Sequence, residues 1–345
     1  MKSKLKIAII ADPELPVPPI LYGGIERIID SLVKELKQLG HSVTLFANSA
    51  STCPANKLYK YAASKQDFKS ILANSLNVSR LLLDKPDIVH SFGRLTYLSA
   101  LIPTRIPKIM SYQREPTIEQ VKKAERLASS GTLYFTGCSN YITNKLKPYV
   151  KALTIYNSVD TAFYQYCGEL QKGAPLVFLG RIEPIKGPHH ALKIAIQAGR
   201  RLIIAGNVPD YARSYFQDHI QPFVDGKQIT YIGPVNDDQK NKLLGEASAL
   251  LMPIEWNEPF GIVMAEALAC GTPVITLSGG AAGEIVTDGV NGYLCNHTDQ
   301  MISAVKQLDK ISRLTCRRDA EDRFSSHVMA AQYEDLYLKM STKSL

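Results

Sequence analysis

The sequence predicts an α/β protein made of two Rossmann-like domains, each a doubly wound parallel sheet. Apolar strand patterns alternate with helical patterns along the chain, and this alternation starts a second time after the connecting segment 160–174. The length of 345 residues is also more than a single hydrophobic core usually supports. We therefore expect two domains that face each other across a ligand-binding cleft.

The first half opens with a βαβ unit. A strand at 4–11 leads through a proline-rich loop to a helix at 25–39, which stops at Gly40 before a second strand at 42–47. The same kind of apolar run predicts the remaining strands of this sheet at 87–90, 108–112, 133–138 and 152–156.

The second half repeats the alternation with shorter elements. Strands are expected at 176–179, 201–205, 228–232, 249–252 and 274–277. The helices that separate them are expected at 188–199, 210–222, 236–247 and 260–270.

The composition is that of an ordinary globular protein, with 45% hydrophobic residues. The apolar run 7–11 is bounded by Lys6 and Asp12 and is too short for a signal-peptide core or a membrane span, which predicts a cytoplasmic protein. The six cysteines include no Cys-x-x-Cys pair, so we expect reduced thiols rather than a metal cluster or a disulfide framework.

The net charge of +8 is concentrated in the first half of the chain. Residues 1–160 hold 22 Lys/Arg against 12 Asp/Glu, whereas residues 161–345 hold 18 against 20. A basic half suggests an anionic surface or acceptor as its partner. Lysines and aromatic residues alternate within 57–69, which fits anionic lipid headgroups, with a solvated loop or helix face as the alternative. No nucleic-acid-binding module is recognisable.

One stretch, residues 258–276, combines a loop, a buried helix and a buried strand. Pro259 occupies a permitted first helical position, and Gly271 ends the predicted helix at 260–270. Glu266 is the one charge in that helix and enters an apolar layer, where an unpaired carboxylate is costly. We therefore expect hydrogen-bond donors to meet Glu266, with ligand hydroxyls as the natural candidates.

The start of this helix predicts an anion-binding position. The backbone N–H groups of Phe260, Gly261 and Ile262 lack partners within the helix, and the helix dipole adds positive potential there. A phosphate or an anionic leaving group suits this position. Together with Glu258 and Glu266, one short segment supplies an anion seat and two carboxylates.

A cationic loop directly follows the first strand of the second half. In the sequence Gly180-Arg181-Ile-Glu-Pro-Ile-Lys186-Gly187, two cations lie at the carboxyl edge of the predicted sheet, where they can hold a diphosphate. Two unrelated surface charges are the alternative, but the strand-end placement favours a ligand.

Glycines and polar residues also end strands in the first half. Gly23 and Gly24 form either a tight turn or a close backbone approach to a ligand, and they do not complete a Gly-x-Gly-x-x-Gly motif. His90, Gln113 and Arg114 stand at strand ends, where parallel sheets bind ligands, with ordinary loop residues as the alternative.

Taken together, these motifs resemble retaining glycosyltransferases of the GT-B fold, family 4, also called glycosyl transferases group 1. The resemblance rests on the Arg181 and Lys186 loop and on the two glutamates separated by seven residues. Further matching segments extend it over nearly the whole chain, at 22–26, 155–160, 202–206, 231–234 and 279–292.

The resemblance implies transfer of a sugar from a nucleotide diphosphate donor to an acceptor hydroxyl, with retained anomeric configuration and neither metal nor other cofactor. Arg181 and Lys186 would hold the departing diphosphate, and Glu258 would hold the sugar ring. Contacts with the substrate are implied for Gly23, Gly24, His90, Gln113, Arg114, Gly206, Asn207, Ile232, Gly233, Phe260, Gly261, Ile262 and Glu266.

The resemblance also implies how the domains divide the work. Residues 1–160, with a C-terminal helix in about 327–345 that crosses back, would take the acceptor, and residues 161–326 would bind the donor. The acceptor would be a glycan, a lipid-linked molecule or a small molecule, in the synthesis of a cell-surface polysaccharide, glycolipid or glycoconjugate. The protein would be cytoplasmic or peripheral on the inner face of the membrane.

One position departs from the family pattern. Many relatives carry a histidine after the strand at 108–112 that touches the donor sugar, and here Gln113 and Arg114 stand instead. Gln113 can hydrogen-bond a hydroxyl but cannot change charge near neutral pH. Our mechanistic hypothesis is front-side attack, with the leaving phosphate as the base.

Two other classes of function stay open at this point. One is a different enzyme of the same architecture, a nucleotide-sugar epimerase or a phosphorylase. The other is a nucleotide-sugar-binding protein without catalytic activity.

Overall fold

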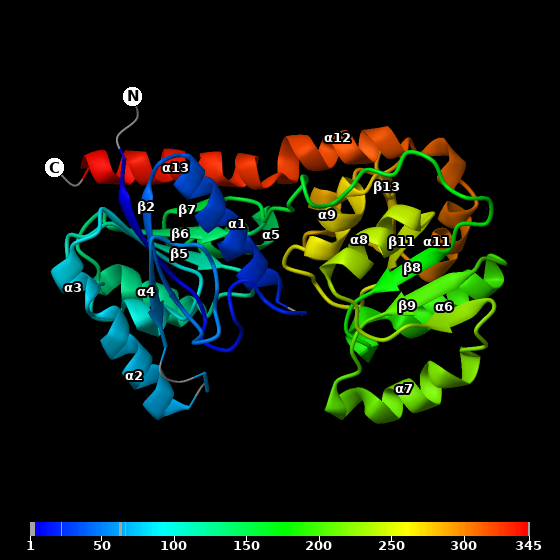
Figure 1. Ribbon diagram of the computed structural model, residues 1–345, viewed down its shortest axis with the longest axis horizontal. Helices are drawn as coiled ribbons and strands as arrows, with labels where there is room; N and C mark the ends of the chain where they lie inside the picture. Colours follow the sequence, from blue (N-terminus) through cyan, green and yellow to red (C-terminus); the bar gives the residue numbers. More distant parts are fainter. Residues whose placement is uncertain (1–3, 22, 62–63, 66, 344–345) are drawn as a thin grey trace. The chain divides into compact units, whose positions relative to one another are not determined.

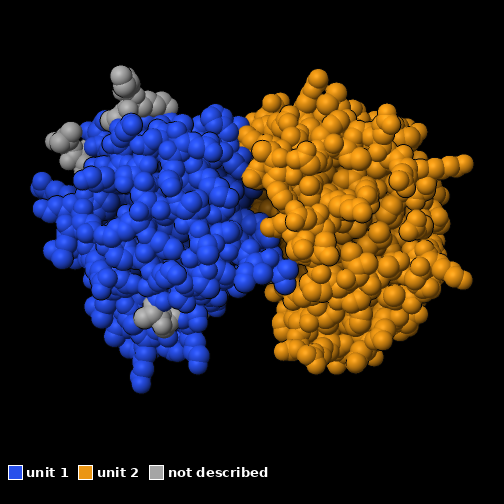
Figure 2. All heavy atoms as spheres, viewed as in Figure 1, with its two compact units in different colours: residues 1–158, 326–345 blue, residues 159–325 orange. Residues whose placement is uncertain are grey.

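The computed structural model describes residues 4–21, 23–61, 64–65 and 67–343. It divides into two compact units, shown in blue and orange in Figure 2. Unit 1 comprises Met1–Ser158 and Ser326–Leu345, and unit 2 comprises Val159–Ser325. The boundaries expected from the sequence lay at 160/161 and 326/327, one or two residues later.

Unit 1 is built on a seven-stranded sheet whose strands are all parallel, in the order β3-β2-β1-β4-β5-β6-β7. The strands are β1 (Lys6–Ile10), β2 (Ser42–Ala47), β3 (Lys57–Lys60), β4 (Ile88–Ser91), β5 (Lys108–Tyr112), β6 (Leu133–Gly137) and β7 (Ala152–Thr154). The predicted parallel sheet is confirmed, with β3 as an additional edge strand.

Helices cover this sheet (Figure 1). They are α1 (Gly24–Gln38), α2 (Phe68–Val78), α3 (Leu81–Asp84), α4 (Ile118–Leu127), α5 (Asn140–Leu146) and the C-terminal α13 (Ser326–Lys343), with a 3-10 turn η1 (Leu95–Leu98). Helix α13 packs against α1 and β4, so the last residues of the chain belong to the N-terminal unit.

Unit 2 contains a six-stranded parallel sheet in the order β10-β9-β8-β11-β12-β13. The strands are β8 (Leu176–Leu179), β9 (Leu202–Ala205), β10 (Ile229–Tyr231), β11 (Ala249–Met252), β12 (Val274–Leu277) and β13 (Gly292–Cys295). The second predicted parallel sheet is confirmed as well, again with one additional edge strand, β13.

The helices of unit 2 lie on both faces of its sheet (Figure 1). They are α6 (Pro188–Gln197), α7 (Arg213–His219), α8 (Asp237–Glu246), α9 (Ile262–Ala269), α10 (Ala282–Ile285), α11 (Thr298–Val305) and α12 (Arg313–Phe324). Short 3-10 turns are η2 (Pro184–Lys186), η3 (Asp210–Ala212), η4 (Gln221–Phe223) and η5 (Leu308–Lys310). Helices α6 and α11 pack together, and α9 packs against α8 and α12.

Helix α9 begins two residues later than the sequence pattern predicted. Gly261 has a φ of 86° and stands before the first helical residue, Ile262, so Pro259 lies outside the helix. The left-handed conformation of Gly261 breaks the helical pattern of its apolar neighbours. The predicted end is confirmed, because Gly271 has a φ of 80° and donates its N–H to Leu268 O.

Among the residues that the structure describes, no helix combines the length and apolarity needed to cross a bilayer. None of the six cysteines, all of which lie within the described residues, takes part in a disulfide, and five of them are buried.

Candidate active site

The strand order of unit 2 brings its candidate residues to one edge of the sheet. The order reverses between β8 and β11, and such a reversal is where doubly wound sheets bind ligands, at the carboxyl ends of the strands. The loop after β8 carries Arg181 and Lys186, and the loop after β11 carries Glu258. The Arg181–Lys186 loop and the Glu258 loop, which are 72 residues apart in sequence from Lys186 to Glu258, therefore meet at this reversal, the switch point of the sheet.

Glycines allow three neighbouring loops to touch at this edge. Gly206 has a φ of 147°, and a Cβ atom there would lie 1.7 Å from Gly180 O. The N–H of Gly206 donates to Gly233 O at 2.8 Å, and Ile182 N–H donates to Asn207 O at 2.9 Å. Close packing of the loops after β8, β9 and β10 therefore requires glycine at position 206.

Two of the predicted catalytic residues are in direct contact. Lys186 Nζ lies 2.6 Å from Glu258 Oε2, and both side chains are 16% exposed. The indole N–H of Trp256 donates to the same carboxylate oxygen at 3.1 Å, and Lys186 Nζ lies 4.9 Å from the centre of the Trp256 ring. The lysine is thus held between a carboxylate and an aromatic face, with a small part of its side chain exposed.

Arg181 is also paired with a carboxylate. Its guanidinium lies 2.8 Å from Glu183 Oε1, and Glu183 is 3% exposed as a residue. The hydroxyl of Tyr211 donates to the other oxygen of Glu183 at 2.5 Å. Glu183 therefore orients the guanidinium of Arg181, while the arginine side chain stays 32% exposed.

The backbone around Glu258 is fixed by the Gly279-Gly280 loop that follows β12. Gly280 has a φ of 53°, and a Cβ atom there would lie 2.3 Å from Glu258 O. Ala281 N–H donates to Glu258 O at 2.9 Å, and Gly280 N–H donates to Asn257 Oδ1 at 3.0 Å. The paired glycines thus hold the carboxylate loop against the sheet edge.

Glu266 is buried on α9, at 4% exposure, as its apolar neighbours predict. Its partners, however, are protein groups: Tyr164 Oη donates to Oε1 at 2.7 Å, and Lys240 Nζ lies 2.5 Å from the same oxygen. This corrects the expectation that ligand hydroxyls must supply the donors. Neither partner could be predicted from the sequence, because they lie 102 and 26 residues away.

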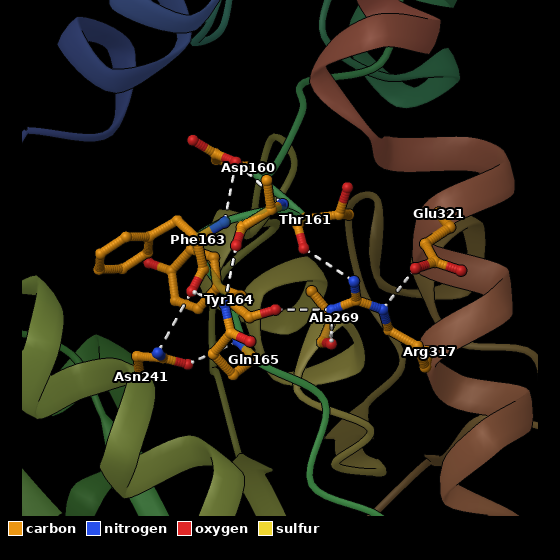
Figure 3. A network of polar contacts seen from close by, with 10 residues as sticks. Asp160, Thr161, Phe163, Tyr164, Gln165, Asn241, Ala269, Arg317 and Glu321 are labelled. Atoms are coloured by element: carbon orange, nitrogen blue, oxygen red, sulfur yellow. Dashed lines mark hydrogen bonds and ion pairs between the residues drawn. The ribbon is translucent and has the colours of Figure 1, made fainter.

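The segment that supplies Tyr164 is tied down by the network in Figure 3. The guanidinium of Arg317 donates to Tyr164 O, Ala269 O and Thr161 O at 2.6, 2.7 and 2.7 Å, and Glu321 orients it at 2.6 Å. Asn241 accepts from Gln165 N–H at 3.0 Å. Helices α8 and α12 therefore fix the loop that positions the Tyr164 hydroxyl.

The predicted anion seat lies at the first turn of α9. Phe260 is 2% exposed, and its ring packs edge-on against Phe324 with centroids 5.7 Å apart. The Phe260 ring thus anchors the loop before α9. The ligand contact predicted for Phe260 depends on its backbone N–H group, because the side chain is buried. Ile262 is partly exposed at the start of the helix. Directly after β10, Ile232 is 45% exposed and presents apolar surface beside Gly233.

In unit 1, the structure supports a packing role for one of the two glycines before α1. Gly23 has a φ of 151°, and a Cβ atom there would lie 2.6 Å from Pro19 Cβ. This favours the tight-turn interpretation for Gly23, while Gly24 is the first residue of α1. Tyr22, which is part of the same motif, lies outside the described residues.

His90 lies in the core of unit 1, and this speaks against the predicted substrate contact. It is completely buried, its Nδ1 lies 2.6 Å from Tyr337 Oη, and its Nε2 lies 2.6 Å from Ser111 Oγ. Burial lowers the pKa of His90 to about 3. A neutral imidazole therefore ties β4 to α13 and β5, which the position at a strand end did not reveal.

Gln113 and Arg114 follow β5 at the carboxyl edge of the unit 1 sheet. The guanidinium of Arg114 donates to Asp12 Oδ2 at 3.1 Å, and Asp12, which follows β1, is 5% exposed. Burial raises the pKa of Asp12, and Arg114 opposes this effect. Oδ1 of Asp12 and Oε1 of Gln113 are buried and make no hydrogen bond, so two acceptors at this edge lack a donor.

Several residues that contact the site were not predicted from the sequence. Glu183, Trp256, Tyr164 and Lys240 each contact a predicted site residue. Glu183 lies inside the predicted loop 180–187, and Trp256 lies just before the predicted stretch 258–276, so their spacing from Arg181 and Glu258 is a usable signal. Tyr164 and Lys240 come from distant segments and needed the fold.

Comparison with known families matches both halves of the chain. The family described as Glycosyltransferase Family 4 matches residues 22–163, and the family described as Glycosyl transferases group 1 matches residues 168–325. Among curated proteins, spore coat protein SA of Bacillus subtilis (strain 168) is 22% identical, over 97% of this chain and 100% of that protein.

Solved structures match over the full length. Sucrose-phosphate synthase from Thermosynechococcus elongatus has a TM-score of 0.82 at 16% identity, covering 99% of this chain and 100% of the other. Anabaena Alr3699/HepE in complex with UDP-glucose has a TM-score of 0.72 at 16% identity, covering 99% and 100%. At these identities the likeness shows the fold.

Proposed function

Because the chain belongs to the GT-B glycosyltransferases, we propose that it moves a sugar from a nucleotide diphosphate sugar to an acceptor hydroxyl with retention of configuration. The donor is proposed to bind unit 2 at the carboxyl edge of its sheet. Arg181 and Lys186 hold the diphosphate, Glu258 meets the sugar hydroxyls, and Glu266 meets the ribose.

One observation carries this proposal: the two cations are brought to the switch point of the sheet, and each is already paired with a carboxylate. The carboxylates orient the cations before the donor arrives, so little reorganisation accompanies binding. The diphosphate then shares Lys186 with Glu258. The accessible parts of Arg181 and Lys186 supply the positive potential that the leaving group needs.

The proposed reaction exchanges one bond at the anomeric carbon for another. The bond from the anomeric carbon to the phosphate oxygen breaks, and its electron pair stays on the diphosphate, where Arg181 and Lys186 stabilise it. The acceptor hydroxyl attacks the same face of the sugar, and its proton passes to the phosphate oxygen that has just been released. The cations of the protein take the stabilising role, so the proposed route uses no metal.

The identity of the substrates is proposed at the level of class. The structural neighbour crystallised with UDP-glucose makes uridine diphosphate sugars the first donors to test. The polar sheet edge of unit 1, with Asp12, Gln113 and Arg114, favours a hydroxyl-bearing acceptor. This acceptor is a glycan, a lipid-linked molecule or a small molecule. We place the protein in cell-surface polysaccharide, glycolipid or glycoconjugate synthesis, in the cytoplasm and at the inner face of the membrane.

The test is a transfer assay on purified protein with a panel of nucleotide sugars and acceptors, comparing Lys186→Ala with the wild type. Loss of the cation should lower turnover by about a hundredfold or more, since it acts on charge that develops in the transition state. Lys193→Ala is the control, because Lys193 is an exposed lysine on the neighbouring helix α6. Equal turnover in Lys186→Ala and the wild type would contradict the mechanism.

The same assay separates the alternative functions. An epimerase converts its donor with no acceptor present, and a phosphorylase depends on free phosphate. A protein that only binds the nucleotide sugar gives a thermal shift without product.

A further inference from the structure

Helix α2 of unit 1 buries two polar side chains and leaves a row of large apolar side chains exposed. The side that packs on the protein carries Ser70, Asn74 and Val78, which are buried. The opposite side carries Phe68, Leu72 and Leu76, which are 80%, 51% and 63% exposed. Residues four apart lie on the same side of a helix, so these three apolar side chains form one stripe. An ordinary surface helix would turn such a stripe inward.

The helix is well formed although it exposes these apolar side chains. The Asp67 carboxylate caps it by accepting the N–H of Ser70 at 2.8 Å. The stripe therefore belongs to a defined surface rather than to a poorly folded segment. A contiguous exposed apolar patch on a soluble domain usually marks an interaction site.

Two cations lie beside the last leucine of the stripe, in a segment rich in basic residues. Residues 57–85 contain six Lys/Arg and two Asp. A surface hollow of about 390 Å³ is lined by Lys60, Ala73, Leu76, Asn77 and Arg80. Its wall thus includes two cations beside the last leucine of the stripe, and an anionic group in the hollow would have apolar surface next to it.

We propose that α2 and this hollow form a binding site for anionic phospholipid, with the stripe in the acyl boundary and a headgroup phosphate between Lys60 and Arg80. An apolar stripe flanked by lysines is the pattern of helices that lie in a membrane interface. The cations favour an anionic bilayer over a second protein, because juxtamembrane Lys and Arg residues gain from its negative potential. The purpose of this site rests on the proposed function: it would bring acceptors made at the membrane to unit 1. The lipid-binding site itself does not depend on that function.

The test is sedimentation of the full chain with vesicles of phosphatidylcholine, with and without phosphatidylglycerol. Binding to the anionic vesicles should fall about thirtyfold in the Lys60→Gln, Arg80→Gln variant. The Leu72→Ser, Leu76→Ser variant should lose binding as well. Both variants should keep transfer to a water-soluble acceptor, so a failure of the membrane site is distinguishable from a failure of the proposed activity.

Matched controls lie on α4 of the same unit. Lys123→Gln with Arg126→Gln removes the same charge, and Leu127→Ser removes an exposed leucine, which is 58% exposed in the wild type. These variants should bind anionic vesicles like the wild type. Equal loss in the control and test variants would overturn the site, because net charge alone would then explain the binding.

Two further outcomes would also overturn the proposal. One is binding to phosphatidylcholine that is as strong as binding to the anionic vesicles. The other is absence of vesicle binding together with a dimer in sedimentation velocity that Leu72→Ser, Leu76→Ser dissociates, since the stripe would then join two copies of the chain.

A separate observation concerns unit 2, where two histidines and a glutamate converge beside the Lys186 loop. His189 and His190 open α6, and their ligand atoms and those of Glu255 all lie within 4.8 Å of one another. His190 Nε2 lies 2.7 Å from Glu255 Oε1. The hydroxyl of Tyr215 lies 2.5 Å from His189 Nδ1, which leaves Nε2 of that ring for another partner.

We infer that these three side chains can bind a divalent transition metal such as Zn²⁺, with water completing the tetrahedron. Two imidazoles and one carboxylate are a known ligand set for zinc, and the bond from Tyr215 would orient the His189 ring. The Glu255 N–H donates to Ile185 O at 3.0 Å, so a metal here would tie together the loops that carry Lys186 and Glu258.

Titration calorimetry with Zn²⁺, and visible absorption with Co²⁺, test this site in the full chain. His190→Gln and Glu255→Gln should each weaken binding by about tenfold or more. His297→Gln is the control, because His297 also neighbours a carboxylate, with Nδ1 4.0 Å from Asp299 Oδ2, at an exposed position. Zinc affinity that is unchanged in the His190→Gln, Glu255→Gln double variant would overturn the inference, as would no binding at all.

Discussion

At the scale of single residues, the burial of charge decides which side chains the donor can use. Glu266 was expected to be buried, and it is, but the structure supplies Lys240 and Tyr164 as its partners. A ligand that contacts Glu266 must therefore do so beside an existing ion pair. The sequence pattern identified the carboxylate because its neighbours are apolar. It could not identify partners brought from other helices.

The pairing of Lys240 with Glu266 predicts a large effect on stability. Lys240→Met should lower the free energy of unfolding by about 3 kcal/mol, because it leaves a buried carboxylate without its cation. Adding Glu266→Gln should recover most of this loss, since the amide needs no cation. Urea denaturation of the single and double variants measures both changes. A double variant no more stable than Lys240→Met would contradict the explanation.

His90 predicts a pH dependence of stability. Its pKa is lowered by burial from 6.5 to about 3, so the neutral ring contributes stability that is complete above pH 6.5 and is lost as the pH falls toward 3. Between pH 7.5 and pH 5, this group should cost the wild type about 2 kcal/mol.

The measurement is the free energy of unfolding of the wild type and of His90→Asn at both pH values. The variant should be less stable at pH 7.5 and should lose less on acidification. If both proteins lose the same amount, protonation of His90 is not the cause.

At the scale of the elements, alternating patterns predicted most strands well and the edges of each unit poorly. The central strands are buried on both faces, so their apolar runs are unmistakable. Strand β3 (Lys57–Lys60) has only half-buried side chains between two lysines, and its sequence reads as a solvated segment. Helix α2 was not predicted either, because Phe68, Leu72 and Leu76 face outward instead of forming a buried stripe.

The loops of unit 2 predict unequal costs for two glycine substitutions. Gly206→Ala should lower the free energy of unfolding by about 3 kcal/mol or more, because its Cβ would meet Gly180 O at 1.7 Å. Gly199→Ala should cost about 1 kcal/mol, since its φ of 63° is strained for alanine but nothing lies within 4 Å of the new atom. Equal costs in denaturation would show that the loop contact at Gly206 relaxes freely.

At the scale of the whole molecule, each unit has its own sheet and its own core. In unit 2 the core runs from β8 and β9 to helices α6 and α11, through side chains such as Phe178, Ile194 and Met301. Unit 2 is one continuous stretch, whereas unit 1 needs α13 from the end of the chain. Length and repeated alternation foretold two domains, and the route of the final helix came only from the family resemblance.

Two units with separate cores predict two transitions in calorimetric unfolding. A nucleoside diphosphate should raise the transition temperature of unit 2, since a ligand stabilises the native state that binds it. Lys240→Met should lower the transition temperature of unit 2, and His90→Asn should lower that of unit 1. A single transition that both variants lower alike would contradict this division.

The central claim is that Lys186 is shared between Glu258 and the donor diphosphate, and calorimetric titration with a nucleoside diphosphate that carries no sugar tests it most directly. Lys186→Ala should weaken binding by about tenfold or more, because a cation next to the phosphates is lost. Glu258→Gln should strengthen binding, because it removes an anion 2.6 Å from Lys186 while keeping a similar side-chain shape. Opposite signs in the two variants are the predicted result, and a change in the same direction, or none in either, would contradict the account.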